Sequence, residues 1–391
     1  MENFQHSSIS SPTDLLCFSH LKWDFVFQRP QHIMTRLTKD YNVYFIEEPN
    51  RHDEADKYTV AKDNGVNIVK FWLDNAVQTS PQIRQRILLD RLMKDRMIKD
   101  HIAWYYTPMA MEFSSHLQSA LTIYDCMDEL SAFKFAPPQL KQMEAMLLKK
   151  AGLVFTGGHS LYEAKKHSHH NIYPFPSSID KQHFEQARTL MPQPADQQNI
   201  PDKRIGFYGV IDERFNIKLV EEVAIQRPDW QLVLIGPVVK IEESELPRNQ
   251  NIHYLGGKTY DQLPVYLSGW DIAFIPFEKN ESTKYISPTK TPEYLAAGKP
   301  VISTSITDVV NPYAVKKLVH IADDAASFIA AAEKVFTEPA AEYNTWLERV
   351  DEFLSVISWD YTVANMTERI KAAIAGLQEL PRTKASLKSV A

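Results

Sequence analysis

The sequence predicts an α/β protein made of two doubly wound domains. Short apolar runs typical of buried strands alternate with amphipathic helical stretches along most of the 391 residues. The alternation forms two series, and each favours a parallel sheet covered by helices on both faces. Residues 186–203, between the two series, carry three prolines and many amides without an apolar period. We therefore expect two domains and a linker.

The first domain is expected at residues 1–187, followed by a linker at 188–203. Its predicted strands are 15–19, 43–48, 101–106, 121–126 and 153–158. Its predicted helices are 81–100 and 137–151, and prolines stand at the start of both. Proline suits the first turn of a helix, where its missing N–H costs no hydrogen bond.

The second domain is expected at residues 204–357. Its predicted strands are 204–209, 230–236, 251–256, 270–277 and 300–304. Helical spacing of apolar residues recurs at 216–228, 260–269, 291–298 and 327–336. A long amphipathic stretch at 359–378 predicts a further helix in the final part, 358–391.

Composition excludes several function classes. The 12 glycines allow neither a G-x-G-x-x-G fingerprint nor a phosphate-binding P-loop. A net charge of −6 argues against a nucleic-acid partner, which usually meets a basic domain. Two cysteines exclude a disulfide framework. Without a leader-like start or an apolar run of 18 residues, we expect a cytoplasmic location.

Residues 286–304 form the sharpest candidate site. Strand ends of a parallel sheet are where ligands bind, and this segment predicts a short helix between two strands. Free amides at a helix start favour anions. Hydroxyls and one cation gather there, and a carboxylate able to accept from a ribose diol follows: Ser287, Thr289, Lys290, Thr291 and Glu293. The alternative interpretation is a capped surface helix with a solvated Glu and Lys.

Residues 288–301 read P-x-K-x-x-E-Y-L-A-A-G-K-P-V. This string resembles the nucleotide-sugar signature of GT-B glycosyltransferases, especially the retaining enzymes of family four. The resemblance covers nearly all of residues 13–375. It implies two Rossmann-like domains that face a central cleft, with a last helix crossing back to the first domain. It also implies a nucleotide-sugar donor bound by the second domain and an acceptor bound by the first.

The resemblance assigns donor-binding roles by position. Glu293 matches the ribose-binding glutamate, and Gly209 matches the glycine beside the phosphates. Arg214 and Lys218 fall near the basic pair that meets the diphosphate, although a solvated helix start is the alternative. Backbone groups of Leu255 and Gly256 fall near the base. Further residues face the phosphates: Thr289, Lys290 and Thr291.

One departure from the family pattern concerns the donor sugar. The family's E-x7-E motif requires Glu at position 285, where this chain has Tyr285. The first Glu of that motif contacts the donor sugar. The pair Ser287 and Lys290 resembles other GT-B subgroups, including the glucuronosyltransferase of xanthan assembly, in which a lysine holds the diphosphate.

The catalytic candidates lie in Y-D-C-M-D-E-L-S, residues 124–131. Crowded carboxylates raise at least one pKa by mutual repulsion, which suits a proton acceptor. The resemblance places this segment at the cleft and favours Asp128 as the base or charge-stabilising group, with Asp125 second. A capping aspartate before a helix is the alternative.

The loop after the first strand supplies the acceptor candidates. It contains His20, Trp23 and Arg29 and no glycine. Trp23 could stack on a sugar ring and Arg29 could pair with a phosphate or carboxylate. A core position for Trp23 and a structural role for His20 are the alternatives.

Two further expectations concern metals and membranes. No D-x-D occurs, so we expect no essential divalent metal and no cofactor; Lys, Arg and helix-dipole charges would neutralise the diphosphate. The helix at 83–99 is basic and amphipathic, which favours either peripheral contact with the inner face of the membrane or packing on the sheet with a solvated side.

The predicted function is transfer of a sugar from a nucleoside diphosphate sugar to a glycan or lipid-linked acceptor in cell-surface polysaccharide synthesis. The resemblance favours a retaining reaction without metal. Two alternatives stay open: a GT-B nucleotide-sugar epimerase, and a nucleotide-sugar-binding subunit without catalysis.

Overall fold

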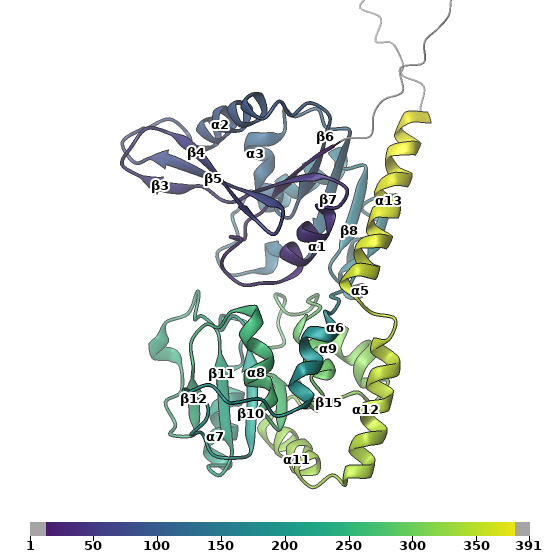
Figure 1. Cartoon of the computed structure of the whole chain (residues 1–391). Coiled ribbons are helices and arrows are strands. Elements are labelled where there is room, and N and C mark those ends of the chain that lie inside the picture. Colours follow the sequence, from purple (N-terminus) through teal and green to yellow (C-terminus); the bar gives the residue numbers. More distant parts are fainter. Residues whose placement is uncertain (1–12, 380–391) are drawn as a thin grey trace, which may run out of the picture.

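A computed structural model describes residues 13–379. It contains two α/β domains, one above the other, and the last helix runs beside the first domain (Figure 1). The predicted α/β class with two parallel sheets is confirmed.

The first domain is built on a nine-stranded sheet in the order β3-β5-β2-β1-β6-β7-β8-β9, with β4 paired to β5. Only the β4–β5 pair is antiparallel. The strands are β1 (Asp14–Phe18), β2 (Asn42–Ile46), β3 (Asn50–His52), β4 (Lys57–Asp63), β5 (Val66–Asp74), β6 (His101–Tyr105), β7 (Leu121–Cys126), β8 (Leu153–Thr156) and β9 (Ile172–Pro174).

Helices cover both faces of this sheet. Successive side chains of β1 point to opposite faces, so Leu16 enters one hydrophobic cluster and Leu15 the other. The first cluster is covered by α2 (Pro81–Asp95), α3 (Met111–Ser114), α4 (Leu140–Lys150) and α5 (His159–Lys165). The second is covered by α1 (Arg29–Leu37) and α13 (Trp359–Glu379).

The β4–β5 hairpin is absent from the sequence-based expectation. Its two-residue turn is Asn64–Gly65, and both residues have positive φ, 46° and 86°. Asn-Gly is the preferred pair for such a turn because both positions need left-handed backbone. The signal was therefore present in the sequence, outside the strand–helix alternation that guided the prediction.

The second domain has a six-stranded parallel sheet in the order β12-β11-β10-β13-β14-β15. The strands are β10 (Arg204–Tyr208), β11 (Gln231–Ile235), β12 (Ile252–Tyr254), β13 (Ile272–Ile275), β14 (Val301–Ser303) and β15 (Val319–Ile321). Its main helices are α7 (Ile217–Gln226), α8 (Leu263–Ser268), α9 (Lys290–Ala296), α11 (Ala325–Phe336) and α12 (Ala340–Leu354). A short helix, α10 (Thr307–Val309), lies between β14 and β15.

The chain crosses to the second domain earlier than the expected boundary at residue 187. Ile179 and Phe184, the latter in α6 (Lys181–Glu185), already belong to the core of the second domain. The expected linker at 188–203 also packs there: the buried Gln197 accepts a hydrogen bond from the Trp270 indole at 2.9 Å. Proline and amide content indicated irregular backbone correctly but gave no information on packing.

The last helix returns to the first domain, as the resemblance implied. The side chains of Trp359, Val363, Met366 and Ile370 join the first domain's core. Trp359 stacks on His32 of α1 with ring centroids 4.7 Å apart. The first domain therefore consists of two separate stretches of chain.

Candidate functional site

A small pocket between the domains gathers polar residues at the carboxyl ends of the strands. Its volume is about 130 Å³. The first domain contributes Val26, Phe27 and Gln28. The second domain contributes Tyr208, Gly209, Val210, Arg214, Lys258, Tyr260, Leu263, Thr289, Lys290 and Glu293.

Lys290 reaches this pocket past Gly209. A Cβ on Gly209 would lie 2.2 Å from Cε of Lys290, and Gly209 has φ +141°, so a side chain is excluded there. The Lys290 ammonium lies 5.5 Å from the centre of the Phe277 ring. Burial and the nearby positive charge of Arg214 lower the Lys290 pKa to about 8. The side chain is thus a cation held in the cleft and able to lose its proton in mildly alkaline solution.

Glu293 lies one turn further along α9 and faces the same pocket. Its side chain is 5% exposed, and one carboxylate oxygen accepts a hydrogen bond from the Tyr208 hydroxyl. Burial raises the Glu293 pKa to about 7, while the Tyr208 hydrogen bond and the charge of Lys290 oppose that rise. Tyr208 is itself positioned by its backbone N–H, which donates to the Tyr294 hydroxyl at 2.9 Å.

Three glycines end neighbouring strands of the second sheet. The Gly236 N–H donates to the Gly256 carbonyl at 3.0 Å, and a Cβ on Gly236 would lie 1.8 Å from the Gly209 carbonyl oxygen. A Cβ on Gly256 or Gly257 would meet nothing within 4 Å. The backbone is therefore tightly packed at the ends of β10 and β11, where Gly209 and Gly236 lie. After β12, at Gly256 and Gly257, it borders open space.

Asp128 of the first domain lies across the cleft from these groups. Its side chain is half-buried, and burial raises its pKa to about 6 against the opposing charges of Arg214, Arg29 and Lys290. Since Arg214 and Lys290 belong to the second domain, the carboxylate feels charges on both sides of the cleft. A carboxylate with this pKa can accept a proton near neutral pH.

Direct contacts hold the two walls close together. The rings of Phe27 and Tyr260 lie 4.6 Å apart, centre to centre. The Arg214 guanidinium lies 5.3 Å from the centre of the Phe133 ring. The backbone N–H of Lys134 donates to a Glu213 carboxylate oxygen at 3.3 Å. Aromatic and charged contacts thus span the cleft at two places.

Comparison with known proteins agrees with this arrangement. A family described as Glycosyl transferases group 1 matches residues 202–338. A provisionally named teichuronic acid biosynthesis glycosyltransferase, TuaH, of Bacillus subtilis (strain 168) is 26% identical over 258 residues, which span 61% of this chain and 64% of that protein.

Solved structures share the fold over nearly the whole chain. A sucrose-phosphate synthase from Thermosynechococcus elongatus has a TM-score of 0.69 at 14% identity and covers 93% of this chain and 100% of its own. Anabaena HepE, in complex with UDP and glucose, has a TM-score of 0.63 at 12% identity and covers 92% of this chain and 100% of its own. Residues 202–338 of this chain therefore match the group 1 glycosyltransferase family, and nearly the whole chain has the GT-B fold of these solved structures.

Five of the residues expected to bind the donor line this pocket: Gly209, Arg214, Thr289, Lys290 and Glu293. Arg214 is already paired with Asp212 of its own loop, with 2.7 Å between Nη2 and Oδ2. Of these two pocket-lining cations, Lys290 forms no ion pair with another residue of the described chain, 13–379. It is the stronger candidate for holding an anionic group.

The other expected donor residues do not line this pocket, although Gly256 ends a neighbouring strand and borders open space. Lys218 is 82% exposed on α7 and pairs with Glu222 at 3.7 Å, which corrects its placement at the diphosphate. The Leu255 N–H donates to Leu234 within the sheet, so it is unavailable to a base. Ser287 contacts Ser177 on the other side of α9's loop, and Thr291 is buried. The spacing of Lys218, Ser287 and Thr291 in the sequence predicted that they lie near α9 or α7, but it could not predict whether each side chain points into the pocket or away from it.

Two of the three residues expected to bind the acceptor, Trp23 and Arg29, have structural roles instead. Trp23 is 8% exposed, packs edge-on against Phe45 and donates its indole N–H to Asp63 at 2.8 Å, so it belongs to the core. The buried Arg29 pairs with Asp125 at 2.8 Å. That ion pair corrects both the acceptor role of Arg29 and the candidacy of Asp125 as a base.

His20 lies at the end of β1 and is half-buried. Burial and the charge of Lys240 lower its pKa to about 4, so it is neutral at physiological pH. Lys240 belongs to the second domain, which places His20 near the cleft. The residues of this loop that reach the pocket are instead Val26, Phe27 and Gln28. The loop composition indicated the right segment, but sequence alone did not distinguish its core side from its cleft side.

Tyr285 stands where the family pattern has a glutamate. It is half-buried and packs against the first domain's hydrophobic cluster. The side chain at this position therefore bridges the two domains. Within residues 13–379, no helix is both long and apolar enough to span a bilayer.

Proposed function

We propose that this glycosyltransferase moves a sugar from a nucleoside diphosphate sugar to a glycan or lipid-linked acceptor in cell-surface polysaccharide synthesis. One observation carries the proposal: Lys290 and Glu293, one helical turn apart, face the same pocket beside the side-chain-free backbone of Gly209. A diphosphate needs a cation and close backbone, and a ribose diol needs a carboxylate that accepts hydrogen bonds.

The proposed donor lies with its base towards Gly256 and Gly257, where the structure leaves open space. Its diphosphate lies at Lys290, and its ribose at Glu293. Lys290 stabilises the negative charge that develops on the leaving diphosphate as the glycosidic bond breaks. A lysine in that role supports the proposal that the reaction needs no divalent metal.

Asp128 is the proposed base or charge-stabilising group. It faces Arg214 and Lys290 from the opposite domain, so it is close to where the reacting sugar would be. In a retaining reaction, the departing phosphate oxygen takes the acceptor proton and Asp128 stabilises positive charge on the sugar ring. In an inverting reaction, Asp128 takes that proton itself. We favour the retaining course on the family resemblance.

The relatives support the polysaccharide assignment. TuaH is named for teichuronic acid biosynthesis, and HepE was solved with UDP and glucose. UDP-sugars are therefore the first donors to test.

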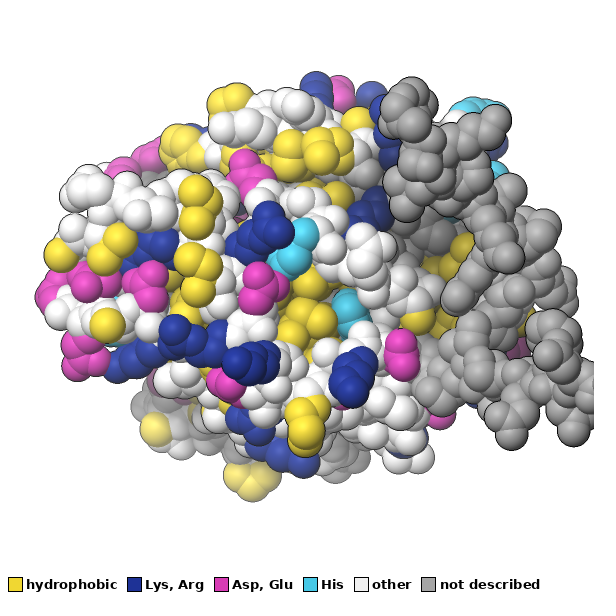
Figure 2. Space-filling view, turned by 90° about the horizontal axis from the view of Figure 1, so that it is seen from above, with side chains coloured by type: hydrophobic (Ala, Val, Ile, Leu, Met, Phe, Trp, Pro, Cys, Tyr) yellow, Lys and Arg dark blue, Asp and Glu magenta, His cyan; other side chains and the backbone are white. Residues whose placement is uncertain are grey.

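We further propose contact with the inner face of the membrane through α2. Its outward side carries the exposed Ile83 and Ile87 together with exposed basic residues, Arg86, Arg91 and Lys94. Figure 2, which views the molecule from the α2 side, shows basic and hydrophobic side chains close together on this face. Apolar side chains among cations suit an anionic lipid surface. Loss of co-sedimentation with anionic vesicles in Ile83→Glu/Ile87→Glu is the expected test result.

The donor site is tested by thermal shift with UDP-, GDP-, ADP- and dTDP-sugars, followed by nucleotide release with the stabilising donor. Lys290→Ala and Glu293→Ala should each lower kcat/KM at least about 100-fold, the effect of losing a charged group in a buried site. Lys218→Ala is the matched control, because its exposed side chain lies outside the pocket. Unchanged donor turnover in both pocket variants would contradict the assignment.

A further inference from the structure

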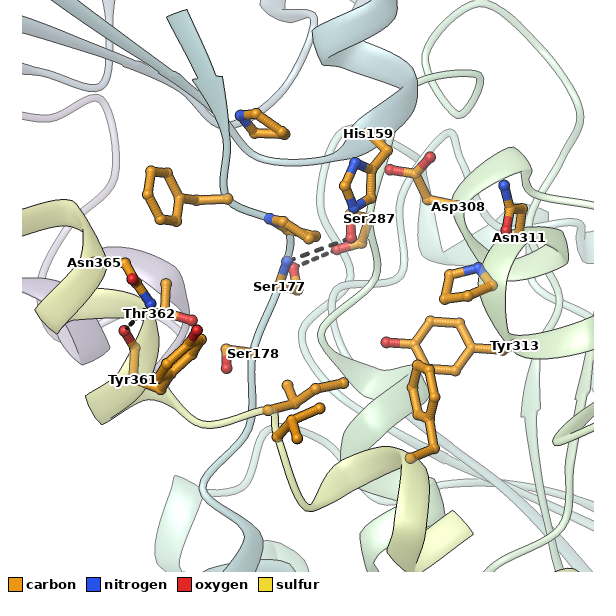
Figure 3. A pocket seen from close by; sticks show the side chains of 17 residues that line it. His159, Ser177, Ser178, Ser287, Asp308, Asn311, Tyr313, Tyr361, Thr362 and Asn365 are labelled. Atoms are coloured by element: carbon orange, nitrogen blue, oxygen red, sulfur yellow. Dashed lines mark hydrogen bonds between the residues drawn. The ribbon is translucent and has the colours of Figure 1, made fainter. Parts of the chain in front are cut away.

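A second and larger pocket lies at the junction of the two domains. Its volume is about 360 Å³, and it shares no lining residue with the donor pocket. The first connection between the domains, residues 174–178, forms one wall, and the return of the chain at 353–365 forms another (Figure 3). Residues 308–313 of the second domain close the third side. Small-molecule sites commonly occupy such places, with volumes of about 300–1,000 Å³.

The walls of this junction pocket favour an uncharged ligand. Its lining includes the apolar side chains of Phe353 and Ile357. The Tyr313 ring stands at one side (Figure 3). Hydroxyl and amide groups of Ser177, Thr362 and Asn365 lie around it. Its lining includes no lysine or arginine, and its one carboxylate is Asp308. Phosphates and carboxylates therefore meet no lysine or arginine here, and His159 is the one imidazole of the lining. Hydroxyl groups meet partners of both hydrogen-bonding kinds.

Two buried polar atoms in the wall have no hydrogen-bond partner in the described part of the chain. Ser178 is 1% exposed and its Oγ is unpaired. Asp308 is 6% exposed; its Oδ1 accepts from the Ser160 N–H at 3.0 Å, while Oδ2 is unpaired. Oδ2 of Asp308 lies beside Gly158 and near the buried Ser160 hydroxyl. Buried polar atoms are nearly always satisfied, so the unpaired Ser178 hydroxyl in the pocket wall points to a missing hydrogen-bond partner.

We propose that the junction pocket binds one uncharged sugar unit, separately from donor and acceptor. The C–H face of a pyranose ring suits the Tyr313 ring and the apolar side chains of the lining. Its hydroxyls supply the partner that Ser178 lacks and reach the amide of Asn365. This binding site does not depend on the proposed transfer activity.

The same pocket is connected to the donor site through Ser287. The Ser177 N–H donates to Ser287 Oγ at 3.4 Å, and the Ser177 hydroxyl donates to the Ser287 carbonyl oxygen. Ser287 lines the junction pocket and precedes Lys290 by three residues. A sugar that contacts both domains stabilises the relative position of the domains in which the junction pocket is closed around it. The same relative position also brings together the residues of the donor pocket. Sugar and nucleotide therefore strengthen each other's binding, a coupling that rests on the proposed donor site.

The test uses the whole protein and ligand-observed NMR with neutral methyl α-D-glucopyranoside, methyl α-D-galactopyranoside and methyl N-acetyl-β-D-glucosaminide, with glucose 6-phosphate as the anionic comparison. At least one neutral glycoside should bind in the presence of saturating UDP, and glucose 6-phosphate should bind at least about tenfold more weakly. Failure of every neutral glycoside to bind, or displacement of the bound one by UDP, overturns the junction site.

Two variants fill the pocket from different sides: Thr362→Phe on α13 and Val356→Trp, whose native side chain is largely exposed and should tolerate replacement. Ala364→Phe is the matched control, because Ala364 is exposed on the same helix and outside the lining. Glycoside binding should fall at least about tenfold in both filling variants and persist in the control. Unchanged binding in both filling variants overturns the site. The bound glycoside should also tighten UDP binding about fivefold; an unchanged UDP affinity would overturn the coupling alone.

Discussion

Gly209 and Lys290 occupy the same small volume, and they can do so only because Gly209 has no side chain. A Cβ at Gly209 would lie 2.2 Å from Cε of Lys290, and the Gly209 φ of +141° is itself strained for any other residue. The position of the Lys290 cation in the pocket thus depends on a glycine 81 residues earlier in the chain.

Gly209→Ala should displace Lys290 and weaken UDP binding by at least about tenfold, or about 1.4 kcal/mol. Isothermal titration calorimetry checks this. Gly257→Ala is the control: a Cβ there meets nothing within 4 Å, so its effect should be small. Equal losses in the two variants would contradict a specific fit between Gly209 and Lys290.

UDP binding should depend on pH through Lys290. Its pKa is lowered to about 8, so the ammonium is present below that pH and is lost above it. An anionic diphosphate requires the protonated form, and wild-type affinity should fall as pH rises through about 8. In Lys290→Ala this alkaline fall should disappear, with affinity low throughout. A fall that persists in the variant would assign the titration to another group.

Substitution of Asp125 should mainly lower stability, whereas substitution of Asp128 should mainly lower activity. Asp125 forms a buried ion pair with Arg29, and Asp125→Ala should lower the free energy of unfolding by about 3–5 kcal/mol, since it leaves a buried charge unpaired. Asp128→Asn should keep the free energy of unfolding within about 1 kcal/mol while kcat falls at least about 100-fold. Denaturant unfolding and initial rates test the pair, and the reverse pattern would exchange the two roles.

Tyr208 should act by holding Glu293. Its hydroxyl donates to a carboxylate oxygen of that residue. Tyr208→Phe keeps the ring and removes the donor, so the donor KM should rise about tenfold with kcat changed less than about threefold. The proposed reason is that Glu293, held by Tyr208, binds the ribose. With a 2′-deoxy nucleotide donor, the donor KM should therefore differ less between the wild-type protein and Tyr208→Phe. Equal differences with both donors would count against that reason.

Local patterns in the sequence were enough to predict the class of fold and the segment around Lys290 and Glu293. Strand–helix alternation predicts two sheets of mainly parallel strands, because parallel neighbours need helical crossovers. The order of the strands within each sheet was not predicted. The short helix at 290–296 was readable from its proline and glycine boundaries. Lys290 and Glu293 lie on the same face of this helix because they are three positions apart.

Contacts between distant parts of the chain explain what the sequence left open. Arg29 and Asp125 are partners across a sheet, and no local pattern distinguishes a buried pair from two exposed charges. Trp23 is held by Asp63, which belongs to the hairpin that the prediction omitted. Phe27 gains its place in the cleft from Tyr260 of the other domain. Each outcome depends on tertiary packing, which outweighs local propensity.

The return of α13 to the first domain sets an order for synthesis. Trp359 and Met366 complete the first domain's core, yet the ribosome makes them only after the entire second domain. The first domain must therefore leave the exit tunnel with the groove beside α1 uncovered. We expect the second domain to reach its native state first and the first domain to close last, with chaperone binding to the nascent chain concentrated on that uncovered groove.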